Sequence, residues 1–147
     1  MSLKNKKDLN EVLQKTAQIL SQRSHSEKEL KQKLSSHFSL NLVEQSIHLA
    51  KQKKWLEDPY ELSLQTTNQL HTKNKSWTHI KGYLQNKGLP LPEYDKDKEL
   101  KKAKILFKKK ASQFKIISQK EKIKIKRFLA YRLFEESIIN EIMEELS

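Results

Sequence analysis

The sequence contains no cysteine and very little glycine or proline. Of its 147 residues, two are Gly and three are Pro. Without thiols the chain has no disulfide framework, thiolate zinc site, iron–sulfur cluster or cysteine nucleophile. Antiparallel strands joined by tight turns need more glycine and proline than this, so the shortage favours helices.

Long apolar runs are also missing. No stretch approaches the ~18 consecutive apolar residues of a membrane-spanning helix, and the N-terminus lacks the apolar core of a secretory signal. We therefore expect a soluble, cytoplasmic protein with no membrane partner. Hydrophobic residues make up only 35% of the chain, whereas globular domains usually have ~45–50% when glycine is counted with them. Several thin cores fit that fraction better than one thick core.

Positive charge is abundant and concentrated in one segment. The net charge is +12, and residues 96–127 hold 14 basic and three acidic side chains. Residues 128–147 hold one arginine and five glutamates, and only three of the 30 basic residues are arginines. A lysine ammonium suits phosphate contacts better than the bidentate reading of base edges. The segment predicts a polyanionic partner, with a solvated, solubilising lysine surface as the alternative.

Apolar spacing predicts helices along almost the whole chain. Ser26 and Glu29 form a capping box, Asp58-Pro59 is a helix start, and Gly88 is a helix stop. Residues 120–127 are ambiguous, because their apolar residues alternate as in a strand but also fit a helix, and we predict a helix. The expected helices cover residues 8–22, 26–37, 42–54, 58–72, 76–88, 100–114, 120–129 and 135–146.

A spacing of apolar residues recurs three times. The segments that begin at Leu30, Ile80 and Ile125 each have a leucine four residues later and then an apolar residue that closes a turn. Such periods indicate stacked supersecondary units. We predict an all-α fold of three tandem three-helix repeats (1–55, 56–97 and 98–147), stacked into an elongated, curved, right-handed or crescent-like array. The alternative is that the three segments share this apolar spacing by chance.

Four segments in order carry motifs of a known family. They are residues 20–34, residues 55–58 (Trp-Leu-Glu-Asp), residues 85–89 (Gln-Asn-Lys-Gly-Leu) and residues 126–134 (Lys-Arg-Phe-Leu-Ala-Tyr-Arg-Leu-Phe). The chain resembles RecX regulatory proteins in these motifs, which together span about residues 15–146. It departs from them at Leu133, where the family usually has glycine. It also departs at Asn74, where the family has an Arg/Lys-Gly pair and where asparagine is able to adopt the left-handed conformation.

The resemblance implies a regulator of RecA in DNA repair, homologous recombination and the SOS response. RecX-like proteins are helical three-repeat proteins that bind the RecA–single-stranded DNA filament along its groove. They generally suppress its ATPase and strand exchange, and they are not enzymes. We expect the RecA filament and single-stranded DNA as partners, double-stranded DNA as a further candidate, and a monomer. The alternative is a stand-alone, basic, helical nucleic-acid-binding protein without a filament partner.

The residues expected to bind RecA or DNA fall into three groups. In the basic segment, Lys120, Lys124 and Arg127 recur at i, i+4 and i+7, so a helix places them on one face. For Arg23, pairing with Glu27 or Glu29 is as good an interpretation as a partner contact. The groups are Lys101, Lys104, Lys108, Lys109, Lys120, Lys124 and Arg127; then Arg23, His25, Lys28 and Lys31; and finally Lys75 and Trp77.

The two tryptophans receive different interpretations. Trp55 is expected in the core, whereas Trp77 is equally suited to stacking on bases or to packing. The five histidines show no HxxxH or HExxH spacing, and no phosphate-loop, GxGxxG or GxSxG motif occurs. We therefore expect no cofactor, no metal site and no catalytic residue.

Overall fold

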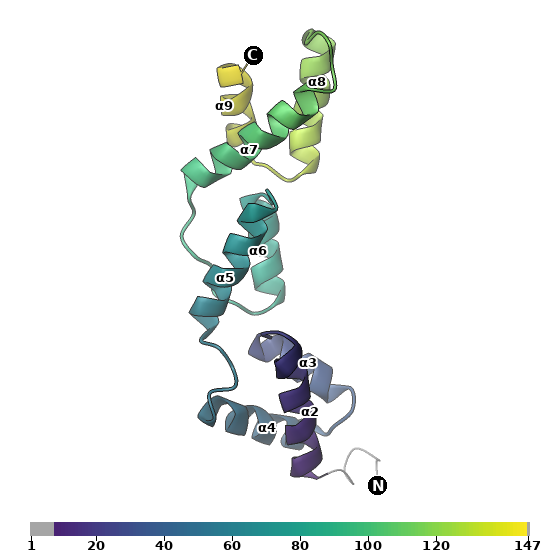
Figure 1. Cartoon of the computed structure of the whole chain (residues 1–147), viewed down its shortest axis with the longest axis vertical. Helices are drawn as coiled ribbons and strands as arrows, with labels where there is room; N and C mark the ends of the chain where they lie inside the picture. The colour runs from purple at the N-terminus through teal and green to yellow at the C-terminus, as the bar shows by residue number, and fades with distance from the viewer. Residues whose placement is uncertain (1–7, 147) are drawn as a thin grey trace. The chain divides into compact units, whose positions relative to one another are not determined.

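The computed structural model describes residues 8–146, and within them it contains eight helices and no strand (Figure 1). The all-α prediction is confirmed, and the ambiguous stretch 120–127 is helical. The helices are α2 (Leu9–Gln22), α3 (Glu27–Ser35), α4 (Leu40–Gln52), α5 (Pro59–Thr72), α6 (Trp77–Asn86), α7 (Lys96–Ala111), α8 (Gln119–Tyr131) and α9 (Glu136–Leu146).

The helix starts lie where the local capping signals predicted them. The Glu11 amide donates to Asp8 Oδ1 at 2.9 Å. Ser26 and Glu29 make both hydrogen bonds of the capping box, and Asp58 Oδ1 accepts from the Glu61 amide at 3.1 Å. Each cap satisfies amides that the first helical turn leaves without an intrahelical partner. These starts therefore depend on residues only three positions apart.

The chain forms two compact units, each with its own core. The first unit contains the residues up to Ser63 and Leu84–Pro90, and the second contains Leu64–Tyr83 and the residues from Leu91 onward. In the first unit α2, α3 and α4 pack on one another, and in the second unit α7, α8 and α9 do so (Figure 1). Two separate small cores agree with the low apolar content.

Both cores consist of the apolar stripes that the sequence predicted. The stripe of α7 is buried at Ala103 and Phe107, with Leu100, Ala111 and Phe114 packed beside them. The fully or nearly fully buried side chains of the first unit's core include Val12, Leu30, Leu34 and Val43, and those of the second include Ile125, Leu129, Ile138 and Ile142.

The middle segment, residues 56–97, differs from the prediction of three helices. It holds only α5 and α6 before α7 begins at Lys96, and residues 87–95 are not helical. Gly88 has a φ of 68°, which ends α6. Pro90 and Pro92 lack backbone N–H groups, and each disfavours helical geometry in the residue before it. An extended connection to α7 is the result.

Four helices end in the same left-handed turn. In each, a residue with positive φ follows the helix, and the next backbone N–H donates to a carbonyl five residues earlier, as in a Schellman motif. The residues with positive φ are Lys54, Asn74, Gly88 and Leu133. The corresponding hydrogen bonds are Trp55 N to Ala50 O (2.9 Å), Lys75 N to Leu70 O (3.0 Å), Leu89 N to Leu84 O (2.9 Å) and Phe134 N to Leu129 O (3.3 Å).

Only one of these four positions is glycine. Asn74 has a φ of 58° and adopts the left-handed conformation that the sequence suggested for it. Leu133, which replaces the family glycine, keeps the left-handed turn with a φ of 68°. A leucine in this conformation brings its Cβ close to a carbonyl oxygen, which costs roughly 1–2 kcal/mol. The left-handed turn is therefore retained, and the backbone at Leu133 is strained.

Leu133→Gly should stabilise the protein. Glycine removes the left-handed strain but costs about 0.5–1 kcal/mol in chain entropy, so we expect a net gain of roughly 0.5–1 kcal/mol in the free energy of unfolding. Leu133 is 49% exposed, so little buried surface is lost. Urea denaturation measures the change. Leu133→Ala keeps the Cβ and should give no gain, and a glycine variant less stable than the alanine variant would contradict the strain.

Candidate nucleic-acid interface

The exposed lysines of α7 form the first part of the candidate interface. Lys101, Lys108 and Lys109 are exposed, and they make no ion pair within residues 8–146. Lys104 is half-buried and pairs with Glu145 Oε1 at 2.9 Å. Three of the four lysines predicted on this helix are therefore available to a polyanion, and the fourth is already neutralised within the fold.

The acidic C-terminal helix α9 supplies that neutralisation. Glu141 lies 3.3 Å from Lys96, and Glu145, four residues later, lies 2.9 Å from Lys104. Residues at i and i+4 share one helix face, so this face of α9 is directed at α7. Exposed pairs of this kind contribute only ~0–1 kcal/mol to stability. These pairs neutralise Lys96 and Lys104, so Lys101, Lys108 and Lys109 are the predicted lysines of α7 that stay outside them.

The exposed cations of α8 form the second part. Lys120, Lys124 and Arg127 are all exposed, and the helical conformation puts them on one face as the spacing predicted. Lys124 Nζ lies 5.8 Å from the centroid of the Phe114 ring. This contact orients the ammonium group while leaving it exposed. A row of cations spaced at one helical turn matches a partner with repeated phosphates.

Trp77 is buried and Lys75 is half-buried. Trp77 is 8% exposed, and its backbone N donates to Glu99 Oε1 at 2.7 Å. Its ring centroid lies 5.8 Å from that of Tyr94. The Lys75 carbonyl accepts a hydrogen bond from Lys102 Nζ at 2.6 Å. Burial therefore rules out the base-stacking interpretation of Trp77 and favours the packing one.

A buried ion pair holds this region together, and no sequence pattern indicated it. Lys102 Nζ and Glu99 Oε2 are 2.7 Å apart, and both side chains are almost fully buried. Burial lowers the pKa of Lys102, whereas the adjacent Glu99 carboxylate opposes that shift. Because Glu99 also accepts from the first amide of α6, it joins α6 to α7. Lys102 stands in a run of lysines, so only the fold distinguishes it from them.

A shallow basic groove lies between the end of α5 and α7 in the second unit. Its volume is about 510 Å³, and its lining includes Lys98, Lys101, Lys102 and His71. Burial and the nearby charges of Lys102 and Lys98 lower the pKa of His71 to about 4. The imidazole is therefore neutral at pH 7, and the lysines alone make the groove positive. Sequence reasoning missed His71, because its lysine neighbours come from another helix.

The second predicted group, around the start of α3, is mostly engaged within the first unit. Arg23 Nη2 pairs with Glu29 Oε2 at 2.9 Å, which matches the structural interpretation of this arginine. Lys87 Nζ pairs with the same oxygen at 2.8 Å. Lys28 is exposed, and its side-chain carbons lie beside Gly88, within 3.1 Å of where a Cβ would stand. Lys31 is exposed, 3.9 Å from Glu44.

His25 is buried, which does not fit the surface role predicted for it. Its side chain is 2% exposed, and Nδ1 lies 2.9 Å from the Arg23 carbonyl oxygen. A carbonyl only accepts, so Nδ1 carries the proton and Nε2 accepts from Lys33 Nζ at 2.7 Å. Burial lowers the pKa of His25, and the charges of Arg23 and Lys33 add to that shift. His25 is therefore a neutral structural residue.

The prediction that Trp55 lies in the core is wrong. It was expected in the core, but 38% of it is exposed. Lys53 Nζ lies 5.5 Å from its ring centroid. An exposed aromatic ring beside an ammonium group is the combination that binds single-stranded nucleic acid by stacking. The sequence signal for such a site was the run Lys53-Lys54-Trp55. It lies at the predicted junction between two repeats, which favoured the interpretation of Trp55 as a core residue.

Two other kinds of site find no support in residues 8–146. None of the helices described there is long and apolar enough to cross a bilayer. Over the same residues, no three histidine, aspartate or glutamate side chains gather into a group that could hold a metal ion.

Glu29→Gln should remove an acid-sensitive part of the stability. Burial raises the pKa of Glu29, but hydrogen bonds from Arg23, Lys87 and Ser26 outweigh it and lower the pKa from 4.5 to about 2. A carboxyl with a depressed folded-state pKa stabilises the fold above its unfolded pKa, and that contribution is lost as the pH falls. The stability difference between wild type and variant should be largest at pH 7, at most about 3 kcal/mol.

Urea denaturation between pH 7 and pH 2 measures this difference. We expect it to shrink from about pH 5 downward as Glu29 becomes protonated. The exposed Glu44 provides the control, because Glu44→Gln should change the stability little at any pH. A Glu29→Gln difference that stays constant with pH would contradict a low pKa for this carboxyl.

Two known proteins are similar to this chain over most of its length. No protein-family model matches the sequence. The chain is 33% identical to the regulatory protein RecX of Clostridioides difficile (strain 630), over 90% of this chain and 66% of that protein. It is 30% identical to the regulatory protein RecX of Yersinia enterocolitica, over 92% of this chain and all of that protein.

A solved structure supports the fold. The crystal structure of RecX from Lactobacillus salivarius has a TM-score of 0.81 with this structure, at 22% identity, and the match covers 94% of this chain and 96% of that one. Together with the two relatives, which match almost the whole chain, this places the protein in the RecX family of regulatory proteins.

Proposed function

We propose that this protein regulates RecA by binding the RecA–single-stranded DNA filament. The observation that carries the proposal is the match, over about nine tenths of the chain, to regulatory proteins RecX. The expected effect is inhibition of the filament's ATPase and strand exchange. On this proposal the protein is a non-enzymatic regulator that acts by binding.

The basic surfaces of α7 and α8 are the proposed contact with the nucleoprotein filament. Lys101, Lys108 and Lys109 are exposed on α7. On α8, exposed Lys120 and Arg127 lie on one face with Lys124. Lysine ammonium groups meet phosphates without reading base sequence, which suits a protein that follows a filament along any DNA. Trp55 joins these residues as a candidate for stacking on an exposed base.

We also propose that the chain consists of three helical repeats, residues 1–55, 56–97 and 98–147, with two helices in the middle one. The left-handed turns after Gly88 and Leu133 occupy matching positions in the second and third repeats. The Leu84–Leu89 and Leu129–Phe134 hydrogen bonds close those turns in the same way. Repeated local geometry of this kind is what stacked supersecondary units have in common.

The single-stranded-DNA-dependent ATPase of RecA tests the function. We expect the ATPase to fall when this protein is added well below one copy per RecA subunit, because a regulator of the assembled filament acts on many subunits at once. DNA binding by the protein alone is measured in the same buffer. If the ATPase falls only once the protein has saturated the free DNA, the protein is a plain DNA competitor, which is the alternative function.

Neutralising the α7 lysines should weaken DNA binding and its salt dependence. Each phosphate contact on a single strand contributes about 0.7 to the slope of log K against log salt. The triple variant Lys101→Gln/Lys108→Gln/Lys109→Gln should therefore lower that slope by about 0.7 for each lysine that contacts a phosphate. Fluorescence anisotropy with labelled oligothymidine at several salt concentrations measures it.

A matched variant separates a local effect from the loss of net charge. Lys15, Lys51 and Lys73 are exposed lysines outside α7 and α8. Lys15→Gln/Lys51→Gln/Lys73→Gln removes the same charge and should leave the slope nearly unchanged. Equal effects of the two triple variants would mean that the α7 surface has no special role.

A further inference from the structure

The second unit contains a small cavity that is lined by basic side chains and by no carboxylate. Its volume is about 110 Å³, and its lining comes from the turn after α5, the first part of α6 and the turn after α8. The lining residues are Asn74, Lys75, His79, Tyr131, Arg132 and Leu133. Because no acidic side chain is among them, an anion in the cavity meets no repulsion from its lining.

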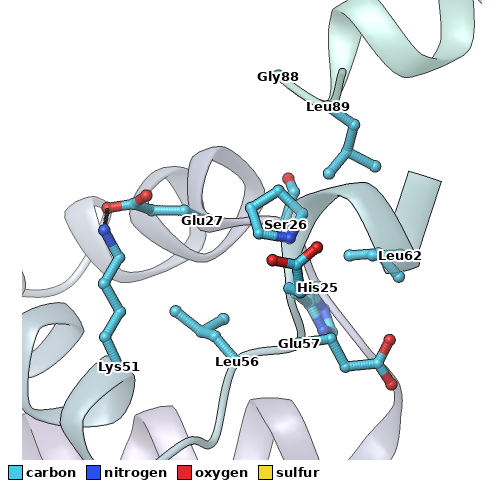
Figure 2. Close-up of a pocket in the computed structure, with 11 residues that line it drawn as sticks. His25, Ser26, Glu27, Lys51, Leu56, Glu57, Leu62, Gly88 and Leu89 are labelled. Carbon is cyan, nitrogen blue, oxygen red and sulfur yellow. Dashed lines mark ion pairs between the residues drawn. The ribbon is translucent and has the colours of Figure 1, made fainter. Parts of the chain in front are cut away.

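The pocket of the first unit that Figure 2 shows has a different character. Glu27, Glu57 and Asp58 are among its lining residues. Glu27 pairs with Lys51 at 2.8 Å, as the dashed line in Figure 2 marks, and Asp58 caps α5. The Glu57 carboxylate is directed away from Glu27 (Figure 2). The charged groups of that pocket therefore do not converge on a common ligand.

Tyr131 is the most exposed of the large hydrophobic side chains in residues 8–146. Its exposed fraction is 86%, and it lies at the last position of α8, in the lining of the cavity. Most of the ring is therefore in contact with water and is available to a planar partner. Exposed aromatic rings beside cations bind single-stranded nucleic acids by stacking on unpaired bases.

Lys75 supplies positive charge in the cavity. Its side chain is half-buried, and none of the ion pairs within residues 8–146 involves it. Burial and the charge of Lys75 lower the pKa of His79, so the imidazole is neutral at pH 7 and one of its nitrogens carries a hydrogen. An unpaired ammonium group and a neutral N–H donor together suit the oxygens of a phosphate.

Two further cations lie on the ring of Phe128, three residues before Tyr131. Arg132 Cζ is 5.2 Å and Lys110 Nζ is 5.3 Å from the centroid of that ring. Cation–π contacts hold both side chains at defined positions, and neither forms an ion pair within the part of the chain that the structure describes. The positive charge near the cavity therefore extends to the ends of α7 and α8.

We infer that this cavity holds one phosphate of single-stranded DNA and that the ring of Tyr131 stacks on the adjacent base. The volume is well below the ~300–1,000 Å³ typical of pockets for whole small molecules, and it suits a group of a few heavy atoms. Lys75 and the His79 N–H would bind the phosphate oxygens, while the base would lie outside the cavity on Tyr131. The inference rests on the proposed function for the presence of DNA, and it adds a site that requires an unpaired base.

Fluorescence anisotropy with labelled oligothymidine tests the two contacts separately. Tyr131→Ala should bind about tenfold more weakly, with the slope of log K against log salt unchanged, because stacking releases no counterions. Tyr131→Phe keeps the ring and should bind like the wild type. Lys75→Gln should lower the slope by about 0.7, the value for one phosphate contact on a single strand.

Tyr60→Ala and Lys73→Gln are the matched controls. Tyr60 is an exposed tyrosine of the first unit, and Lys73 is an exposed lysine two residues before Lys75. Neither lines the cavity, so both variants should keep the affinity and the slope of the wild type. Thermal unfolding of every variant verifies that the fold is intact. Equal losses in Tyr131→Ala and Tyr60→Ala, or equal slopes in Lys75→Gln and Lys73→Gln, would overturn the inference.

Two small probes identify the chemistry of the ligand. Dithymidine with a 5′-phosphate should give saturable shifts in ¹⁵N–¹H spectra at Lys75, His79 and Tyr131, and these should weaken in Tyr131→Ala. Inorganic phosphate should shift Lys75 and His79 only, with several-fold lower affinity. Equal affinity for the two probes would mean a site for a free anion without a stacked base, and absence of shifts at these residues would exclude the cavity as a DNA contact.

Filament binding separates failure of this site from failure of the proposed function. If the wild type binds RecA filaments and Tyr131→Ala binds oligothymidine like the wild type, the site is wrong and the proposed function stands. Loss of filament binding by Tyr131→Ala in that case would make the ring a protein contact. If the wild type binds oligothymidine through Tyr131 but does not bind filaments, the site stands and the proposed function fails.

Discussion

In each compact unit, one glutamate carboxylate connects residues of the middle helical pair, α5 and α6, to a three-helix core. In the first unit Glu29 accepts from Arg23 and from Lys87, at the end of α6. In the second unit Glu99 accepts from the Trp77 amide at the start of α6 and pairs with buried Lys102. Removing one partner of a buried pair leaves an uncompensated charge, which costs about 3–5 kcal/mol. The small apolar cores leave little stability to absorb such a loss.

Ion pairs within the fold also determine which basic side chains remain available to a partner. Several basic residues of this chain form ion pairs within the fold. Arg23 pairs with Glu29, Lys102 pairs with Glu99, and Lys96 and Lys104 pair with glutamates of the acidic helix α9. The count of 30 basic residues therefore overstates how many are available to a partner. The exposed cations of α7 and α8 lie outside these pairs, and so do exposed lysines elsewhere, such as Lys15 and Lys73. Basic side chains attract DNA without distinguishing bare DNA from a filament, so preference for the filament requires contacts with the protein partner as well.

The sequence predicted the features that short-range chemistry determines. The Ser26 capping box, the Asp58 cap and the Gly88 stop each depend on residues within a few positions, and all three are present. The buried stripe of α7 follows from helical periodicity in the same way.

The predictions that were wrong depend on contacts between residues far apart in the sequence. Trp77 is buried with its ring against Tyr94, and Trp55 is 38% exposed beside Lys53. The middle segment has two helices instead of the three expected of a repeat, because residues 87–95, with Pro90 and Pro92, form an extended connection. The environments of Lys102 and His71 are formed in part by residues of other helices, so the local sequence does not predict them. The family itself was predicted from motifs in order, a signal that does not depend on the tertiary contacts.

The central claim is that this protein recognises the assembled RecA filament rather than DNA alone. The most direct measurement compares the affinity of the labelled protein for RecA–single-stranded DNA filaments, formed with a non-hydrolysable ATP analogue, with its affinity for the same bare DNA at the same salt concentration. We predict tighter binding to the filament, and a preference that grows as salt increases, because salt weakens the phosphate contacts on which binding to bare DNA depends. Equal or tighter binding to bare DNA across the salt range would contradict the account.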